Sequence, residues 1–270
     1  MNGITTGVLY VVPTPIGNLE DITLRALRVL RETPVIACED TRVTANLLRH
    51  FEIPHKRMIS YFTGNEAARV AQIVAIMLSG EDVALVSDAG TPGISDPGTR
   101  LIAGAIEAGI RVVPLPGPTA LATAITASGL PTDAVAFEGF LPHKKGRRTA
   151  IAKLAGEERT IVFYESPHRI VKTLRELADV LGEERPAAIC RELTKLYEEI
   201  NRSTLGALHA DYSARQSIKG EFVLVVKGAA KAEKKRGDKY SRNAPEDEDE
   251  DEAGESPEHD GDGISFDPST

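Results

Sequence analysis

The sequence lacks the features that mark disulfide-stabilised, metal-binding and membrane-spanning proteins. It has 2 cysteines in 270 residues, and Cys38 and Cys190 both lie in apolar, strand-like runs, which favours buried free thiols over a disulfide. No cluster of Cys and His has the spacing of metal ligands, so we expect no metal. No apolar run reaches the roughly 18 residues that a membrane-spanning helix requires, and the first residues lack the pattern of a secretory signal. These absences predict a cytoplasmic protein.

Two common nucleotide-binding signatures are also missing. The sequence contains neither G-x-G-x-x-G, the dinucleotide-binding fingerprint, nor G-x-x-x-x-G-K-[ST], the loop that cradles the phosphates of nucleoside triphosphates. Their absence argues against an ordinary dehydrogenase or ATPase.

The acidic surplus of the chain is confined to residues 229–270. The formal net charge is −8, but residues 229–270 hold 6 Lys and Arg against 14 Asp and Glu, which leaves 26 of each sign in the part before them. This segment is basic from Lys231 to Arg242, whereas the run from Pro245 to Gly263 has no Lys or Arg. Because residues 229–270 include few apolar residues, we expect them to form a disordered tail.

Short apolar runs alternate with helical patterns along the rest of the chain. In the first half this alternation predicts a parallel sheet with right-handed crossovers, with strands near residues 8–12, 35–38, 58–61, 83–86 and 111–113. In the second half we expect a mixed sheet, with strands near residues 134–138, 160–164, 187–191, 197–203 and 222–226. The Pro/Gly run from Pro114 to Pro118 is the best boundary between them. We therefore predict an α/β protein with two α/β domains, residues 1–117 and 118–228, followed by the disordered tail 229–270.

The loop that follows the strand near 83–86 is the most informative segment of the chain. Its sequence, SDAGTPGISDPG from Ser87 to Gly98, combines glycines that let the backbone approach a ligand with prolines that rigidify the rest. Similar Pro/Gly loops follow the strands that end near residues 12 and 113. Ligands of open α/β sheets bind beyond the carboxyl ends of the strands. We therefore expect one binding site at these loops, with Asp88 facing a cationic or hydroxyl-bearing ligand.

Seven motifs occur in an order that resembles a known family. They are PTPIGNLEDIT, ACEDTR, SDAGTPGISDPG, PLPGPTA, FEGFLPHKKGRR, FYESPHR and GEFVLVVKG. Together they resemble the tetrapyrrole-methylase superfamily of S-adenosylmethionine (SAM) methyltransferases. Within it they resemble the branch that methylates the ribose 2′-OH of a cytidine in the decoding region of small-subunit (16S) ribosomal RNA (rRNA). The resemblance implies a class III methyltransferase fold, with a SAM cleft between the two domains, and a homodimer.

The same resemblance implies which residues hold SAM. They come from the three Pro/Gly loops and from the end of the strand near 160–164, which we expect to reach back across the cleft. For Phe163, simple core packing is the alternative. The expected cofactor-binding residues are Ile16, Gly17, Ser87, Asp88, Ala89, Ile94, Ser95, Thr119, Ala120, Phe163 and Tyr164.

Polar residues outside the apolar pattern are the candidates for catalysis. Glu165, His168 and Arg169 follow the strand near 160–164. Removing the proton of a ribose hydroxyl calls for a base or a polarising cation, and both Glu165 and His168 are candidates for the base. A helix start is the alternative role of His168, so the sequence leaves the proton acceptor unassigned.

Basic residues are the candidates for RNA contact. Arg42 ends the ACEDTR motif, where a helix cap is the alternative role of its acidic neighbours. A second group opens an expected helix near 144–154, where positive charge opposes the helix dipole, which favours phosphate binding over a merely solvated face. This group consists of Lys144, Lys145, Arg147 and Arg148.

We therefore expect a SAM-dependent 2′-O-methyltransferase of small-subunit rRNA. One alternative is a relative that methylates a tetrapyrrole, a substrate that does not need the basic cluster. Another is a catalytically inert RNA-binding protein that retains the fold. The acidic run is most simply a solubilising appendage, and the alternative is that it competes with RNA for the basic surface.

Overall fold

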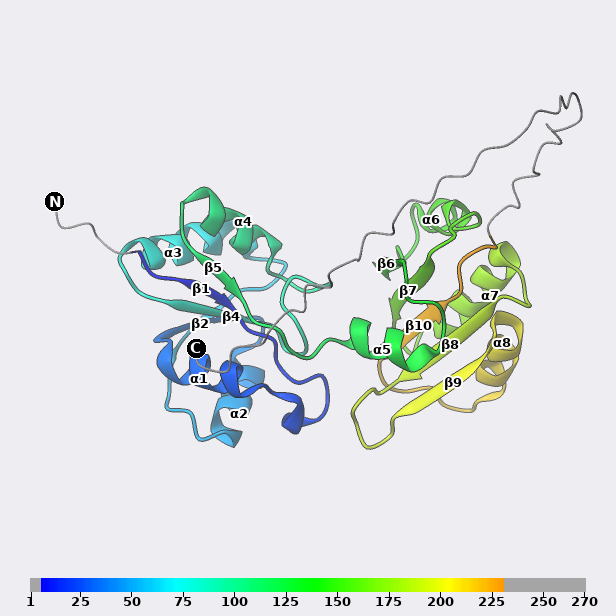
Figure 1. Ribbon diagram of the computed structural model, residues 1–270, viewed down its shortest axis with the longest axis horizontal. Helices are drawn as coiled ribbons and strands as arrows, with labels where there is room; N and C mark the ends of the chain where they lie inside the picture. The colour runs from blue at the N-terminus through cyan, green and yellow to red at the C-terminus, as the bar shows by residue number, and fades with distance from the viewer. Residues whose placement is uncertain (1–5, 231–270) are drawn as a thin grey trace, which may run out of the picture. The chain divides into compact units, whose positions relative to one another are not determined.

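A computed structural model of the chain describes residues 6–230. Nearly all of the predicted tail, residues 231–270, lies outside the described residues, as do residues 1–5. Within the described part, ten strands form two five-stranded sheets, in the strand orders β3-β2-β4-β1-β5 and β6-β7-β10-β8-β9 (Figure 1).

The first sheet is parallel throughout, as the alternating pattern predicts. Its strands are β1 (Leu9–Val11), β2 (Val35–Cys38), β3 (Arg57–Ser60), β4 (Val83–Val86) and β5 (Val112–Pro114). Strands β2 and β4 are buried at every residue. The two faces of the sheet carry separate cores, because alternate strand residues point to opposite sides.

Helices cover both faces of the first sheet. Helices α3 (Glu66–Leu78) and α4 (Thr99–Glu107) pack with Val35, Ala37 and Leu85 on one face. Helices α1 (Leu24–Glu32) and α2 (Thr41–His50) pack with Ile36 and Cys38 on the other. Figure 1 shows these pairs on opposite sides of the strands. This is the doubly covered arrangement in which ligands bind at the carboxyl ends of the strands.

The second sheet is mixed, also as predicted. Its strands are β6 (Val135–Phe140), β7 (Thr160–Glu165), β8 (Pro186–Arg191), β9 (Glu199–Thr204) and β10 (Phe222–Val226). Only β6 and β7 pair in parallel, and the remaining neighbours are antiparallel. One face packs on α6 (Arg147–Lys153), α7 (Ile170–Leu181) and α8 (Leu205–Ala214), and the other packs on α5 (Ala120–Ser128).

The observed elements correct the sequence reading in two places. Helix α8, which buries Leu205, Leu208 and Tyr212, was not expected. Helix α6 begins at Arg147 rather than near Lys144, so Lys144 and Lys145 precede it. The short helix η1 (Leu19–Asp21) adds a turn to the loop after β1.

The predicted α/β fold is confirmed, whereas the division into domains at residue 117 stays a prediction. Cys38 and Cys190 are both buried and free, as their apolar surroundings indicate. No helix in residues 6–230 has both the length and the apolar character needed to cross a membrane.

Candidate functional site

Three loops at the carboxyl ends of the first sheet are tied together by hydrogen bonds. Thr14, after β1, and Gly90, after β4, exchange both backbone hydrogen bonds at 2.9 Å. The hydroxyl of Thr91 donates to the carbonyl oxygen of Pro118, after β5, at 3.0 Å. Because β1 lies between β4 and β5, the Pro/Gly loops converge on one place, as expected from their positions in the sequence.

Gly90 shows why this loop needs glycine. Its φ is +82°, a backbone conformation that side chains disfavour. A Cβ atom there would also lie 3.3 Å from Cγ2 of Ile16. The absence of a side chain at Gly90 lets the loop after β4 approach the loop after β1 closely.

These loops form part of a cavity of about 410 Å³, which we call the acidic cavity. Its other residues come from the ends of β2, β6, β7 and β8 and the segments that follow them, and from the start of β10 and the two residues before it. Of the predicted cofactor-binding residues, it is lined by Ile16, Asp88, Ala89, Ile94, Ser95, Thr119, Ala120 and Tyr164. It is also lined by residues that are not among the expected cofactor-binding residues, namely Glu39, Asp96, Phe140, Leu193, Glu221 and Val223.

Carboxylates dominate the charge of this cavity. Its charged lining residues are Glu39, Asp88, Asp96, Glu165 and Glu221, and within residues 6–230 no Lys, Arg or His lines it. Burial, reinforced by the charges of Glu39 and Asp88, raises the pKa of Asp96 to about 7. Burial also raises the pKa of Glu39 and of Asp88. Such a cavity favours a cationic ligand and disfavours a phosphate-bearing one.

A second cavity of about 470 Å³ adjoins the acidic cavity. Ile16, Asp88 and Ala89 line both of them. The remaining residues of the second cavity come from the loop after β1, from α2 and from Ser87. They are Thr14, Pro15, Gly17, Leu19, Val43, Thr44, Asn46, Leu47, His50 and Ser87.

Gly17 and Ser87 therefore lie at the second cavity rather than at the acidic one. A side chain on Gly17 would collide with Lys195 and would lie 3.0 Å from the carbonyl oxygen of Leu193. The backbone N–H of Asn18 donates to the Thr194 hydroxyl at 3.0 Å. Gly17 thus allows the loop after β1 to lie against the segment between β8 and β9.

The expected cofactor contact of Phe163 is not found. Phe163 is fully buried among residues of α7 and α8, on the face of β7 opposite to Tyr164. Alternation along the strand explains the difference, because adjacent residues cannot face the same side. Tyr164 lines the acidic cavity and packs edge-on against Phe137 and Phe140.

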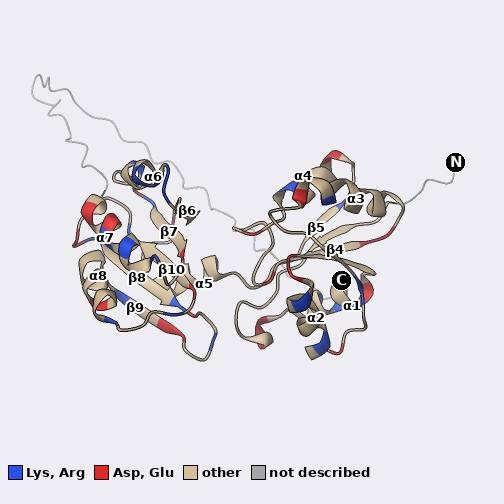
Figure 2. Ribbon diagram, turned by 180° about the vertical axis from the view of Figure 1, so that it is seen from behind, with Lys and Arg blue, Asp and Glu red and all other residues tan. Residues whose placement is uncertain are grey.

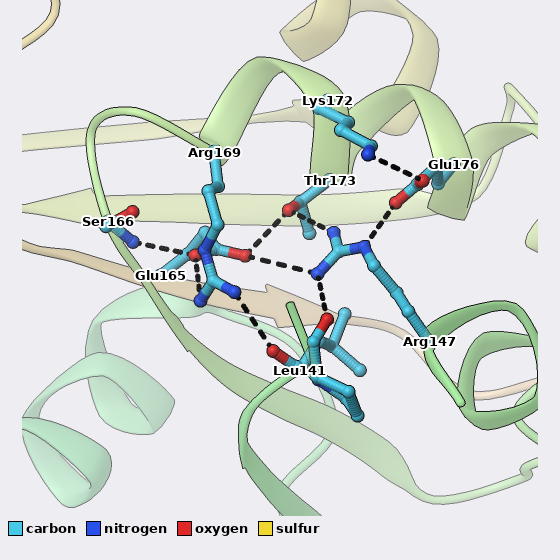
Figure 3. A network of polar contacts seen from close by, with 9 residues as sticks. Leu141, Arg147, Glu165, Ser166, Arg169, Lys172, Thr173 and Glu176 are labelled. Atoms are coloured by element: carbon cyan, nitrogen blue, oxygen red, sulfur yellow. Dashed lines mark hydrogen bonds and ion pairs between the residues drawn. The ribbon is translucent and has the colours of Figure 1, made fainter. Parts of the chain in front are cut away.

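Glu165, at the end of β7, is the centre of a buried polar network (Figure 3). Its carboxylate lies 2.7 Å from Nη2 of Arg169. It also accepts hydrogen bonds from the Thr173 hydroxyl at 2.7 Å and from the Ser166 backbone N–H at 2.8 Å. Its two oxygens are already engaged by these donors, so the geometry favours a positioning role for Glu165.

Arg147 belongs to the same network, which corrects its expected contact with RNA. Its Nε lies 2.7 Å from the Glu176 carboxylate, and its guanidinium also donates to Thr173 and to the carbonyl oxygen of Pro142. Only 4% of the residue is exposed. The side chain of Arg147 therefore has no surface with which to bind a phosphate.

The other predicted polar residues lie at the surface. Lys144, Lys145 and Arg148 are exposed around the start of α6, and Figure 2 shows the basic residues gathered there. Arg42, on α2, is exposed and pairs with Asp40. His168 is exposed and lines neither cavity. The acidic cavity and the basic surface are thus carried by different residues.

The sequence of this chain matches known proteins over most of its length. The family described as Tetrapyrrole (Corrin/Porphyrin) Methylases matches residues 8–209. Ribosomal RNA small subunit methyltransferase I of Escherichia coli O157:H7 is 50% identical over 224 residues, which cover 82% of this chain and 78% of that protein. The protein of the same name from Vibrio cholerae is 51% identical over 223 residues, covering 82% of this chain and 77% of its own.

Solved structures share the fold at lower sequence identity. The methyltransferase CobJ matches with a TM-score of 0.64 and 20% identity, covering 83% of this chain and 95% of that one. Uroporphyrin-III C-methyltransferase from Thermus thermophilus, complexed with S-adenosylhomocysteine, matches with a TM-score of 0.57 and 20% identity, covering 81% and 97%.

Proposed function

Because this chain belongs to the tetrapyrrole (corrin/porphyrin) methylase family, we propose that it is a SAM-dependent methyltransferase of small-subunit rRNA. The relatives that are about 50% identical carry the name of an rRNA methyltransferase and are covered over more than three quarters of their length. The acceptor proposed from the sequence motifs is the ribose 2′-OH of a cytidine in the decoding region.

The observation that carries the proposal is the charge of the acidic cavity. SAM bears a sulfonium and an α-ammonium group against a single carboxylate, so it is a net cation. Asp88, Asp96 and Glu39 offer negative charge to these cations and acceptors to the ribose hydroxyls. Apolar walls, including Ile16, Ile94 and Leu193, complete a site of the kind that small ligands occupy. The residues present therefore fit SAM, and the same charge disfavours dinucleotides and nucleoside triphosphates.

When bound, SAM supplies an electrophilic methyl group to the attacking hydroxyl oxygen. The protein has to orient the acceptor and to take the proton that the hydroxyl loses. Glu165 is held by its network and His168 lies outside both cavities, so neither of the bases expected from the sequence has the right surroundings. We assign the proton to the Asp88 carboxylate, which lines both cavities and pairs with no Lys or Arg within residues 6–230.

The basic residues at the start of α6 suit the polyanionic substrate. Lys144, Lys145 and Arg148 are exposed and have no carboxylate partner within the described part of the chain. Phosphate contacts of this kind position RNA without reading its sequence.

Transfer of tritium from labelled SAM tests the proposal directly. Label in the RNA of small ribosomal subunits supports it. Label only in an added porphyrinoid would identify a tetrapyrrole methyltransferase instead. RNA binding without transfer would identify an inert relative.

The assembly and the location of the protein are also part of the proposal. A homodimer is inferred from the resemblance to the superfamily, and it would widen the surface presented to a ribosomal subunit. Light scattering at micromolar concentration should give twice the mass of one chain, and the mass of a single chain would contradict it. A cytoplasmic location follows from the proposed substrate and is checked by fractionation.

A further inference from the structure

The proposed function uses the acidic cavity but leaves the second cavity without a role. At about 470 Å³, the second cavity falls within the range of sites that hold small ligands. It shares Ile16, Asp88 and Ala89 with the acidic cavity. A group bound in the second cavity would therefore adjoin the methyl donor bound in the first.

The lining of the second cavity suits a flat, polar ring. Pro15, Leu19, Val43 and Leu47 provide apolar surface, and the imidazole of His50 provides an aromatic face. Unpaired RNA bases are recognised by such stacking together with hydrogen bonds to their edges.

The side-chain amide of Asn46 can form hydrogen bonds with the edge of a bound base. Its Oδ1 accepts a hydrogen bond from Arg49 at 3.2 Å, which directs the amide N–H donors elsewhere. Within residues 6–230, no protein group accepts from these donors. The Asn46 amide can therefore donate to the carbonyl oxygen and ring nitrogen that a pyrimidine such as cytosine presents.

The surface around the second cavity carries the charge that a nucleotide requires. Helix α2, which forms one wall, exposes Arg49 and also Arg42, which pairs with Asp40. Figure 2 shows blue, basic positions on this helix, which are arginines. The acidic cavity, in contrast, is lined by carboxylates alone among its charged groups. The cationic donor and the anionic acceptor are thus matched to different cavities.

We propose that the second cavity binds the target pyrimidine nucleotide of the rRNA, splayed out of its strand. Its base lies between the apolar side chains of α2 and the loop after β1, and its ribose lies at the wall shared with the acidic cavity. The Asn46 amide reads the base edge, and the shared Asp88 faces the ribose hydroxyl. This inference rests on the proposed rRNA methyltransferase function and adds the place where the substrate nucleotide binds.

Filling the second cavity tests the proposal. Val43→Trp adds bulk at a residue that lines only this cavity and is 41% exposed, so the fold can tolerate the change. We expect methylation of isolated small ribosomal subunits to fall by roughly 100-fold or more, because the acceptor loses its position. Affinity for SAM, measured by calorimetry, should stay within about twofold of the parent value. Ile106→Trp introduces the same indole side chain on α4, outside both cavities, and should leave both quantities unchanged.

A second, nearly isosteric variant guards against misfolding of the first. Asn46→Asp replaces the amide donors by acceptors, so it should lower kcat/KM for ribosomal subunits while the melting temperature and SAM affinity are kept. Full methylation by both variants would overturn the proposal and leave the proposed function intact. Failure of the parent protein to methylate any rRNA would instead overturn the proposed function, and this binding site with it.

Discussion

The Nη2 atom of Arg169 lies 2.7 Å from Oε1 of Glu165, and the Glu165 side chain is 1% exposed. The same carboxylate lies 4.0 Å from Nη1 of Arg147. Two arginines from separate segments therefore converge on one buried acid at the end of β7, beside the acidic cavity (Figure 3). The network therefore holds the start of α6, where Arg147 lies, against the end of β7, where Tyr164 lines the acidic cavity.

Glu165→Gln should destabilise the protein strongly. The change leaves the Arg169 guanidinium without its anion, whereas Arg147 keeps its pair with Glu176. Breaking a buried pair in this way typically costs about 3–5 kcal/mol. Urea unfolding measures the effect. Glu32→Gln, which breaks an exposed pair with Arg28, is the matched control and should have little effect. Equal stability of the two variants would contradict the structural role of Glu165.

SAM binding should tighten as the pH rises through about 7, because the carboxyl of Asp96 must ionise to face a cation. The folded-state pKa of Asp96 is raised, so its stabilising contribution to folding is complete below about pH 4 and is lost as the pH rises toward 7. Ligand affinity and folding stability thus change in opposite directions. Calorimetry across this range measures the first, and Asp96→Asn should remove most of its pH dependence. An unchanged profile in the variant would assign the dependence to another group.

Asp88→Asn should lower the rate of methyl transfer by about 10²–10⁴-fold, the usual contribution of a general base. The variant keeps the size of the side chain and the acceptor for the Asp40 backbone N–H, so the fold should be retained. Single-turnover measurements with saturating SAM separate this loss from weaker cofactor binding. Asp179→Asn, at an exposed residue of α7, is the control. A normal single-turnover rate would remove Asp88 from the proton transfer.

Reversing the exposed cations Lys144 and Arg148 to Glu should abolish methylation of ribosomal subunits while SAM affinity is kept. Binding of RNA by the parent protein should weaken steeply as the salt concentration rises, because phosphate contacts release counterions. Lys153→Glu, at an exposed residue of the same helix, is the control for charge alone. If the double variant methylates normally, this surface has no part in substrate binding.

Arg147→Ala should behave differently from its basic neighbours. It removes a buried partner of Glu176 and Thr173, so the expected result is a lower melting temperature rather than a specific loss of RNA affinity. Comparing thermal melts and RNA binding of this variant with those of Arg148→Ala separates the two roles. A melting temperature equal to that of the parent protein would show that the ion pairs of Arg147 contribute little.

Local patterns in the sequence determined much of the first sheet and of the acidic cavity. An apolar run such as Val83 to Val86 predicts a buried strand. Because the Pro/Gly loop follows this strand directly, Asp88 and Gly90 must lie at its carboxyl end. Because parallel strands end at a common edge, the loops after β1, β4 and β5 had to converge. The motifs then identified the family from residues that are close together in the chain.

Only the tertiary structure decided which of several similar residues serve which purpose. Arg147 and Arg148 are adjacent and chemically alike, yet packing against α7 buries one and leaves the other at the surface. Phe163 and Tyr164 face opposite sides of β7, and the sequence does not state which side borders the cavity. The pKa of Asp96 is raised mainly by burial and then by the charges of Glu39, which follows β2, and of Asp88, which lies in the same loop as Asp96. Such properties depend on contacts between separate segments, and the sequence pattern of any one segment cannot contain them.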